Sequence, residues 1–466
     1  MEIFNNALDW FNNFLWTYVL VISLIAIGIY FSFKTKFVQF RYLKEMFRLL
    51  GDGVSDKDHG GVSSFQAFCI STASRVGTGN LAGIAMAISI GGAGAIFWMW
   101  LIALIGAASS FVESTLAQIY KVKDKSGTFR GGPAYYMEKG LNKKWMGFIF
   151  SILITITFGL IFNSVQSNTI ASAFNEAFNV NQLVIGIVIT ALTALIIFGG
   201  IHRIAKVTEV IVPIMAVAYI GIALLVVILN IKEIPSLLLT IIENAFGFKE
   251  VVGGSLGGIL MVGIKRGLFS NEAGMGSAPN AAATATVSHP VKQGLIQTLG
   301  VFTDTIIICS CTAFIILLSP VDFTAEGISG IKLTQVALSS HVGSWGSYFI
   351  AICILLFAFS SIVGNYYYGE SNLEFLSNSK YALIFYRVFV IGMVFMGSIA
   401  SMDLVWALAD VFMGLMAITN LIAIVLLGKF AFKALEDYSK QKNAGIVDPV
   451  FKASSIPGLE NVDEWK

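Results

Sequence analysis

The chain has 466 residues, of which 56% are hydrophobic and only 12% are charged. Its mean hydropathy is +0.78, which excludes an ordinary soluble domain. Basic and acidic residues nearly balance, with 30 of the first kind and 28 of the second. The composition predicts an integral membrane protein, and because the apolar runs do not alternate with polar residues, helices are favoured over a β-barrel.

Eleven apolar segments are long enough to cross a hydrocarbon core about 30 Å thick as helices. The first is too long for a cleaved signal peptide and lacks a basic leader, so we expect it to remain as a helix. The sequence therefore predicts an all-α membrane protein with about eleven transmembrane helices. In chain order the segments cover approximately residues 14–33, 63–90, 94–120, 146–168, 183–199, 207–230, 251–287, 293–318, 346–376, 382–400 and 404–428.

Three regions outside these segments differ in character. Residues 34–62 mix apolar and basic side chains at helical spacing, which predicts an interfacial helix at the inner leaflet. Residues 121–145 are rich in glycine and contain a proline, which indicates a turn-rich hinge rather than a helix. The tail after residue 429 becomes polar, and its Pro-Gly and Ser-Ser pairs predict an irregular end.

The distribution of basic residues indicates the orientation, since short cytoplasmic loops retain positive charge. If the first helix exits into the cytosol, the inner segments hold 24 Lys and Arg residues and the outer loops hold three. The N-terminus should therefore lie outside the plasma membrane and the C-terminus in the cytoplasm. The basic loops are better explained as topology signals and lipid headgroup contacts than as nucleic-acid patches.

Two of the apolar segments contain glycine-rich interruptions. Gly77-Thr78-Gly79-Asn80 interrupts segment 63–90, and residues 263–279 place four glycines and a proline inside segment 251–287. A broken membrane helix frees backbone N–H and C=O groups that lipid cannot satisfy, so it survives where it lines a cavity or holds a ligand. Such glycines can also serve close helix packing, but two matching interruptions favour a binding site.

The positions of the two breaks predict an internal repeat. Without the first helix, the other ten form two sets of five, and a broken segment opens each set. Because five is odd, the second set enters from the opposite side, as in inverted-topology repeats that bind substrate and ions near the midplane. This divides the chain into 1–62 with the N-terminal helix, repeats at 63–230 and 251–428, and a tail at 429–466.

The ends of broken helices suit an amino acid and a cation. A half-helix that begins near Thr78 points unpaired N–H groups and the positive end of its dipole at the break, which suits a carboxylate. The half-helix that ends near Val76 offers carbonyl oxygens, which suit a small hard cation such as Na⁺. Carbonyls at the second break, from Phe269 to Glu272, could hold the amino group of the same substrate.

Polar residues inside the apolar segments are further candidates. Ser360 and Ser361 could give hydroxyl oxygens to a cation, or bond only to their own backbone. Asn163 and Gln166 share a helix face and could line a polar cavity, or bond between helices. A structural, gating or proton-linked pair is expected between Arg75 and one of the acids at membrane depth, which are Glu113, Glu272, Asp304 and Asp410.

Other functional classes fit the sequence less well. The four histidines lie in loops or near segment ends, without the spacing of a metal-dependent membrane enzyme. A channel needs a continuous pore, whereas two breaks in an inverted repeat fit an alternating-access carrier. Within carriers, proton coupling is the alternative to Na⁺ coupling, with Glu113 or Glu272 as the titrating group.

Four stretches, 76–85, 94–100, 131–136 and 267–279, closely resemble the alanine or glycine:cation symporter family, also called sodium:alanine symporters. The likeness covers roughly residues 10–430. It implies a Na⁺-coupled amino-acid symporter with no other cofactor and a leucine-transporter-like 5+5 inverted repeat, preceded by one extra helix. The resemblance favours alanine or glycine as the substrate, with glutamine as the alternative.

The resemblance also implies roles for individual residues. The substrate carboxylate would lie on the amides of Thr78 and Gly79, beside Gly77. The side-chain oxygen of Asn80 would bind one cation. A second cation would take the carbonyls of Ala73 and Val76 with Ser360 and Ser361, and the substrate pocket would be completed by Phe269, Ser270 and Asn271. Arg75 departs from the residue expected in many relatives.

Overall fold

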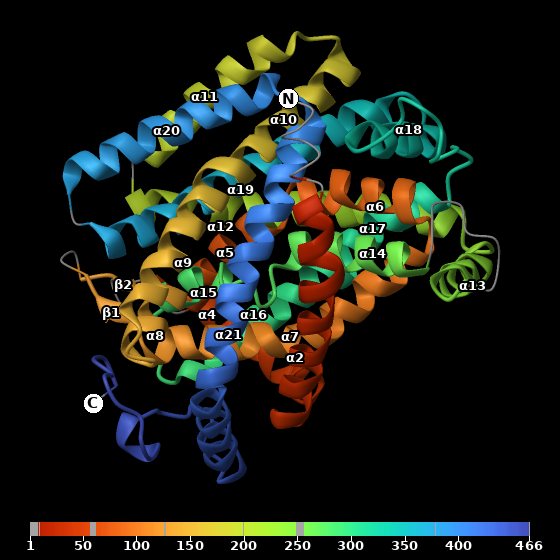
Figure 1. Cartoon of the computed structure of the whole chain (residues 1–466). Coiled ribbons are helices and arrows are strands. Elements are labelled where there is room, and N and C mark those ends of the chain that lie inside the picture. Colours follow the sequence, from red (N-terminus) through yellow and green to blue (C-terminus); the bar gives the residue numbers. More distant parts are fainter. Residues whose placement is uncertain are drawn as a thin grey trace.

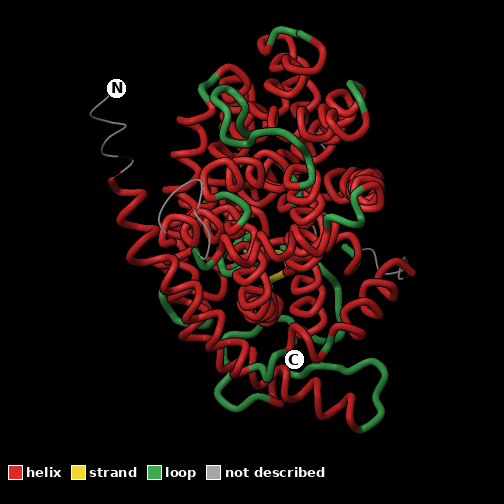
Figure 2. Tube along the Cα trace, turned by 90° about the vertical axis from the view of Figure 1, so that its right-hand side faces the viewer, coloured by secondary structure: helices red, strands yellow, loops and turns green. Residues whose placement is uncertain are grey.

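The computed structural model describes residues 8, 10–55, 62–124, 127–198, 200–247, 256–377 and 379–465. These residues form a bundle of helices with one short two-stranded sheet (Figure 1). The N-terminal helix runs along one side of the bundle toward the end where the tail folds, as two perpendicular views show (Figures 1 and 2).

Within the described residues, eight helices are long and apolar enough to cross a membrane. Each coincides with a predicted segment, so these eight predictions are confirmed. The other three predicted segments are the two interrupted ones and the shorter helix α11 (Gln182–Ile197), and the count of eleven crossings stays a prediction. The eight helices are Trp10–Lys34, Gly94–Ile119, Lys144–Phe178, Lys206–Leu229, Pro290–Leu317, Trp345–Leu376, Lys380–Ile399 and Met402–Asn443.

Several long helices change their winding along their length. A π-helical segment adds a residue to the turn and often marks a functional site, and such segments occur in the first, third and fifth of these eight helices. Those helices are built from η1 (Leu15–Leu20) and α2 (Val21–Lys34); α9 (Lys144–Ile156), η3 (Thr157–Phe162) and α10 (Asn163–Phe178); and α16 (Pro290–Val301), η4 (Phe302–Cys309) and α17 (Ser310–Leu317). The others are α7 (Gly94–Ile119), α12 (Gly200–Leu229), α19 (Trp345–Leu376), α20 (Lys380–Ile399) and α21 (Met402–Asn443).

Both predicted helix breaks are confirmed. The first segment consists of α5 (Ser64–Arg75), then η2 (Gly79–Gly83) continued by α6 (Ile84–Gly91). The second consists of α14 (Leu256–Asn271) and α15 (Ala278–Thr284). Helix α5 packs against α12 and α19, and α14 packs against α7 and α6. The two breaks therefore lie inside the bundle, among the long helices (Figure 1).

The connections between long helices contain the helix predicted within 34–62, whose place at the inner leaflet stays a prediction, and they correct another prediction. A helix is present in the predicted interfacial region, as α3 (Val38–Arg41) and α4 (Leu43–Ser55). The prediction of a hinge without a helix at 121–145 is wrong, because strands β1 (Val122–Lys123) and β2 (Phe129–Arg130) precede helix α8 (Pro133–Lys139). Gly132 at φ 121° and Pro133 in the first turn start this helix. The remaining connections hold α13 (Ile234–Ala245) and α18 (Ile331–Val342).

The prediction of an irregular end is also wrong for the first part of the tail. Helix α21 continues to Asn443, because buried residues recur at a helical interval past Lys429, as Phe430, Ala434 and Tyr438 do. Beyond the helix, the tail folds back over the loop after α15. The amide of Phe451 donates to the carbonyl of Ser288 at 2.9 Å, and residues 453–455 form the short helix η5 (Ala453–Ser455).

Candidate functional site

The first break is a short extended segment closed by an asparagine. Val76 leaves the helix with φ −82° and ψ 94°. The side-chain oxygen of Asn80 then accepts the amide of Gly77 at 2.9 Å, and the amide of Asn80 donates to the carbonyl of Gly77 at 3.2 Å. Asn80, in the first turn of the new half-helix, thus accepts the backbone amide of a residue just before that turn, as the later residue of a capping box does.

The second break is held open by a carboxylate from another helix. Three of its residues have positive φ: Glu272 at 58°, Gly274 at 84° and Gly276 at 87°. The amides of both glycines donate to the carboxylate of Glu113 on α7, each at 3.1 Å. Asn420 on α21 donates to the same carboxylate at 2.8 Å. The anion-binding amides of this break are therefore already occupied by a side chain of the protein.

Oxygen atoms from α5 and α19 converge beside the first break. The hydroxyl of Ser361 lies 2.8 Å from the carbonyl oxygen of Ala73, 3.3 Å from that of Val76 and 3.1 Å from that of Phe357. A hydroxyl has one proton, so it can satisfy only one of these three carbonyls at a time. The carbonyl of Phe357 also accepts from Ser360, so those of Ala73 and Val76 share the single proton of Ser361, and such carbonyl oxygens are the ligands that a hard cation prefers.

Ser360 lies differently from its neighbour. Its hydroxyl donates to the carbonyl of Phe357 at 2.8 Å and points to the sulfur of Met215 on α12 at 3.7 Å. Of the two predicted serine ligands, the structure therefore brings only Ser361 into contact with the carbonyls of α5.

A second polar cluster surrounds the carboxylate of Asp304 on η4. This carboxylate accepts the side-chain amide of Asn80 at 2.6 Å and the hydroxyls of Ser270 and Thr305 at 2.6 Å and 2.8 Å. Asp304 is fully buried, and within the described residues no basic side chain forms an ion pair with it. A buried carboxylate among neutral donors lacks the positive partner that a low-dielectric site requires.

Gln166 on α10 reaches the first break directly. Its side-chain oxygen accepts the amide of Thr78 at 2.9 Å, so a substrate carboxylate can use this amide only when Gln166 moves aside. Asn163, one turn earlier, donates to the carbonyl of Gly159 in its own helix. Several polar atoms near the two breaks are buried without a hydrogen-bond partner in the described structure: the Thr78 hydroxyl, Asn163 Oδ1 and Asn271 Nδ2.

The two glycines of the first break are required by close approach. A Cβ atom added to Gly77 would lie 2.2 Å from the hydroxyl oxygen of Ser361 and 2.7 Å from Gln166 Oε1. A Cβ atom at Gly79 would lie 2.8 Å from the ring of Phe269. Glycine is therefore needed where α10, α14 and α19 meet the break.

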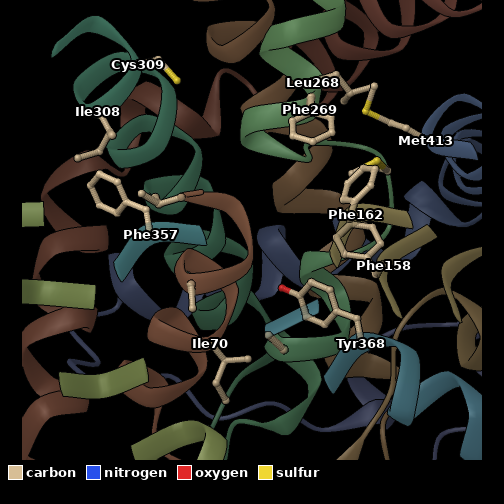
Figure 3. Close-up of a cluster of buried hydrophobic side chains, with 14 of the residues drawn as sticks. Ile70, Phe158, Phe162, Leu268, Phe269, Ile308, Cys309, Phe357, Tyr368 and Met413 are labelled. Carbon is tan, nitrogen blue, oxygen red and sulfur yellow. The ribbon is translucent and has the colours of Figure 1, made fainter. Parts of the chain in front are cut away.

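Aromatic rings form a column beside the breaks, in which consecutive ring centroids are 4.7–5.4 Å apart. Figure 3 shows Phe269, Phe162, Phe158 and Tyr368 one below another, with Cys309 on the opposite side. Trp406 on α21 continues the column beyond Phe269. The column thus joins rings from η3, α14, α19 and α21 beside the breaks.

A charged cluster caps the Trp406 end of the column. The guanidinium of Arg266 lies 4.5 Å from the centroid of the Trp406 ring. It also forms an ion pair with Asp410 at 2.9 Å, and Lys265 pairs with the same carboxylate oxygen at 3.2 Å. The cluster ties α14, the first half of the second broken helix, to α21.

The predicted ion pair of Arg75 is wrong. Its guanidinium donates to the carbonyl of Gln297 at 3.2 Å and to the hydroxyl of Ser110 at 3.4 Å. Across the described residues, no carboxylate lies within 4.0 Å of it. The four acids considered from the sequence have other partners: glycine amides and Asn420 for Glu113, Ser74 and Ser277 for Glu272, Asn80 and hydroxyls for Asp304, and basic residues of α14 for Asp410.

Comparison with known proteins places this geometry in a family. Residues 1–453 match the family model described as the sodium:alanine symporter family. The chain belongs to this family. It is therefore a carrier and not an enzyme, and the family resemblance seen in the glycine-rich stretches is confirmed.

Two relatives of this sodium:alanine symporter family member come from Bacillus subtilis (strain 168). The probable sodium/glutamine symporter GlnT is 59% identical over 97% of this chain and 94% of its own length. The amino-acid carrier protein AlsT is 58% identical over 100% of this chain and 98% of its own length. Among solved structures, MhsT in complex with L-phenylalanine has a TM-score of 0.55 at 16% identity, over 82% of this chain and 97% of that one. This likeness shows that the chain has the fold of leucine-transporter-like carriers.

Sequence reasoning did not assign Asp304 and Cys309 to the site of this family member. The structure brings both to Asn80 and Ser270, with the Cys309 sulfur 3.0 Å from the Ser270 hydroxyl. A lone acid inside an apolar segment was the available signal for Asp304. The sequence contained no comparable signal for Cys309, since a buried cysteine usually packs as a small apolar residue.

Proposed function

We propose that this protein imports a small neutral amino acid together with Na⁺, by alternating access. The observation that carries the proposal is the excess of oxygen acceptors around the Ser361 hydroxyl, where α5 ends at the first break. Alanine or glycine is the first candidate substrate. Glutamine is the alternative, which the name of the relative GlnT supports.

The two breaks would divide the recognition of the substrate. Because Glu113 occupies the amides of Gly274 and Gly276, the substrate carboxylate would bind at the first break, on the amides of Thr78 and Gly79. The amino group would then lie against carbonyls of the second break, near Phe269, Ser270 and Asn271. The rest of the pocket would be Gly77, Asn80, Asn163 and Gln166.

Two cation sites are supported by the donor sets. The carbonyls of Ala73 and Val76 with the Ser361 hydroxyl would hold one Na⁺, and Ser360 would join them if its hydroxyl turned away from Met215. The carboxylate of Asp304 would hold the other with Ser270, and the side-chain oxygen of Asn80 would join them if its amide group turned over, because the nitrogen now faces Asp304 and the oxygen accepts the Gly77 amide. These oxygen ligands fit a hard cation in kind, and the carboxylate supplies the negative charge that neutral carbonyls lack.

The orientation and the repeat complete the proposal. We place the protein in the plasma membrane with its N-terminus outside and its tail in the cytoplasm, in agreement with the basic inner loops. Regions 63–230 and 251–428 would be the inverted five-helix repeats. The Arg266–Asp410 pair over Trp406 would then close the path from the outside, so we refer to Arg266, Lys265, Asp410 and Trp406 as the outer gate.

Uptake by purified protein in proteoliposomes tests the function. Radiolabelled alanine, glycine and glutamine are each offered with an inward Na⁺ gradient, an inward H⁺ gradient, or neither. We expect accumulation driven by Na⁺ alone. Equal uptake with choline in place of Na⁺ contradicts Na⁺ coupling, and uptake driven by H⁺ alone would favour proton coupling through Glu113 or Glu272.

Ser361→Ala should raise the Na⁺ concentration for half-maximal uptake by about tenfold, because it removes one oxygen ligand from a hard-cation site. The apparent substrate constant should rise only at limiting Na⁺, since the binding of the two solutes is reciprocally linked. Uptake measured against Na⁺ at two substrate concentrations checks both effects. Ser360→Ala is the matched control, with the smaller effect expected; an unchanged Na⁺ dependence for Ser361→Ala would remove this hydroxyl from the site.

A further inference from the structure

We propose that the N-terminal helix, which lies outside both repeats, holds the outer gate closed, and that Trp16 is the positioning residue through which it acts. The inference rests on the proposed alternating access. Its evidence, however, is a separate set of contacts between η1 and the two helices that carry the gate.

The N-terminal helix forms hydrogen bonds to α21 at the turn that carries the gate carboxylate. The indole N–H of Trp16, which is fully buried, donates to the backbone carbonyl of Asp410 at 3.2 Å. One turn earlier, the side-chain amide of Asn12 donates to the carbonyl of Ala407, also at 3.2 Å. Two polar side chains of the first helix thus bind two carbonyls on successive turns of α21.

The same tryptophan also touches the basic side of the gate. The ammonium of Lys265 lies 5.2 Å from the centroid of the Trp16 ring while it pairs with Asp410. Attraction between a cation and an aromatic face is stronger where water is excluded. Trp16 therefore contacts both helices of the gate. Its ring lies against Lys265 of α14, and its N–H donates to a carbonyl of α21.

Helix α21 also packs closely against this helix one turn below the gate carboxylate. A Cβ atom added to Gly414, one turn below Asp410, would lie 2.5 Å from Leu15 and 2.9 Å from Leu20. Separation of α14 from α21, which opening of the gate requires, must therefore break the Trp16 contact with at least one of them. If Trp16 only filled space between the helices, its indole N–H would not matter. Removal of this N–H therefore tests the inference.

The test uses Trp16→Phe, which keeps an aromatic ring beside Lys265 and removes the N–H donor. Cys309 is a natural reporter beneath the gate, since its sulfur lies 3.3 Å from the side-chain nitrogen of Asn80. The other three cysteines are first replaced by alanine: Cys69, Cys311 and Cys353. The rate at which a membrane-impermeant methanethiosulfonate reagent modifies Cys309 from outside then measures opening of the gate.

We expect Trp16→Phe to raise this rate about fivefold, the factor that corresponds to the net free energy of one buried hydrogen bond. The external substrate concentration for half-maximal uptake should fall by a similar factor, because a larger share of the protein is open to the outside. Trp10→Phe is the control, since Trp10 lies on the same helix but is 68% exposed. It should change neither quantity.

The outcomes separate this inference from the proposed function. If Trp16→Phe changes neither the labelling rate nor the half-maximal substrate concentration, the inference is wrong even though Na⁺-driven uptake persists. If the wild type transports no amino acid, the proposed function fails, while a faster labelling of Cys309 would still support a gate held by Trp16. Should Trp16→Phe be poorly extractable, Asn12→Ala removes the second contact and must produce the same two shifts. A matching change in Trp10→Phe would show a general effect of the helix and overturn the role of Trp16.

Discussion

Gly77→Ala is expected to lower amino-acid uptake by about 100-fold while the protein remains folded and extractable. The new methyl group would lie 2.2 Å from the Ser361 hydroxyl oxygen and 2.7 Å from Gln166 Oε1. Forcing an extra carbon into a packed site costs about 1–3 kcal/mol, and about 1.4 kcal/mol corresponds to a factor of ten. The strain acts on the cation site and the substrate site together, because both neighbours of the methyl group belong to them.

Gly221→Ala is the matched control for this change. Gly221 lies in the membrane helix α12, and nothing lies within 4 Å of a Cβ atom built there, so uptake should stay at the wild-type level. Initial rates of uptake, normalised to monodisperse protein on size-exclusion chromatography, provide the measurement. Wild-type uptake by Gly77→Ala would show that the first break is not where substrate and ion bind.

Glu113→Gln is expected to reduce the maximal rate of uptake by about 30-fold or more. The carboxylate accepts three hydrogen bonds, from the amides of Gly274 and Gly276 and from Asn420. A glutamine of the same shape turns its NH₂ group toward at least one of these donors, and a buried donor without an acceptor costs about 1–3 kcal/mol. The positive-φ backbone of the second break would lose the partner that fixes it.

Glu176→Gln serves as the control, because Glu176 pairs with Lys332 at a site where both side chains are well exposed and such pairs contribute little. Uptake kinetics of the two variants at saturating Na⁺ give the comparison. If Glu113→Gln retains the wild-type maximal rate, the second break does not depend on this carboxylate. The amides of the second break could then bind the substrate carboxylate, which would contradict the proposal that it binds at the first break.

The sequence predicted the helix breaks because their cause is local. Glycines and a proline interrupt apolar segments, and the need to satisfy backbone groups in lipid applies at any position in the chain. The contact of Ser361 with the carbonyls of Ala73 and Val76 was also predicted, because the inverted repeat implied by the family resemblance specifies which helices pack together. These features depend on residue type and order along the chain.

The sequence could not predict contacts that depend on how distant helices rotate against each other. Asn80, Ser270 and Asp304 meet across separations of up to 224 residues, and no local pattern shows which face of η4 turns inward. The charge of Arg75 predicts an acidic partner, yet its guanidinium donates to a carbonyl and a hydroxyl. Glycine and proline at 131–133 predict a hinge equally well, but Pro133 starts helix α8.

The folded tail affects the order in which contacts form while the chain is synthesised. The indole of Trp465 donates to the carbonyl of Gln118 at 2.8 Å, across 347 residues of sequence. The backbone amide of Phe451 donates to the carbonyl of Ser288 in the loop after α15. At about 5–20 residues per second, synthesis of the intervening chain takes roughly 20–70 seconds. For that interval the carbonyl of Gln118 near the end of α7 lacks this partner, so the packing of this face is completed only after Trp465 has been synthesised.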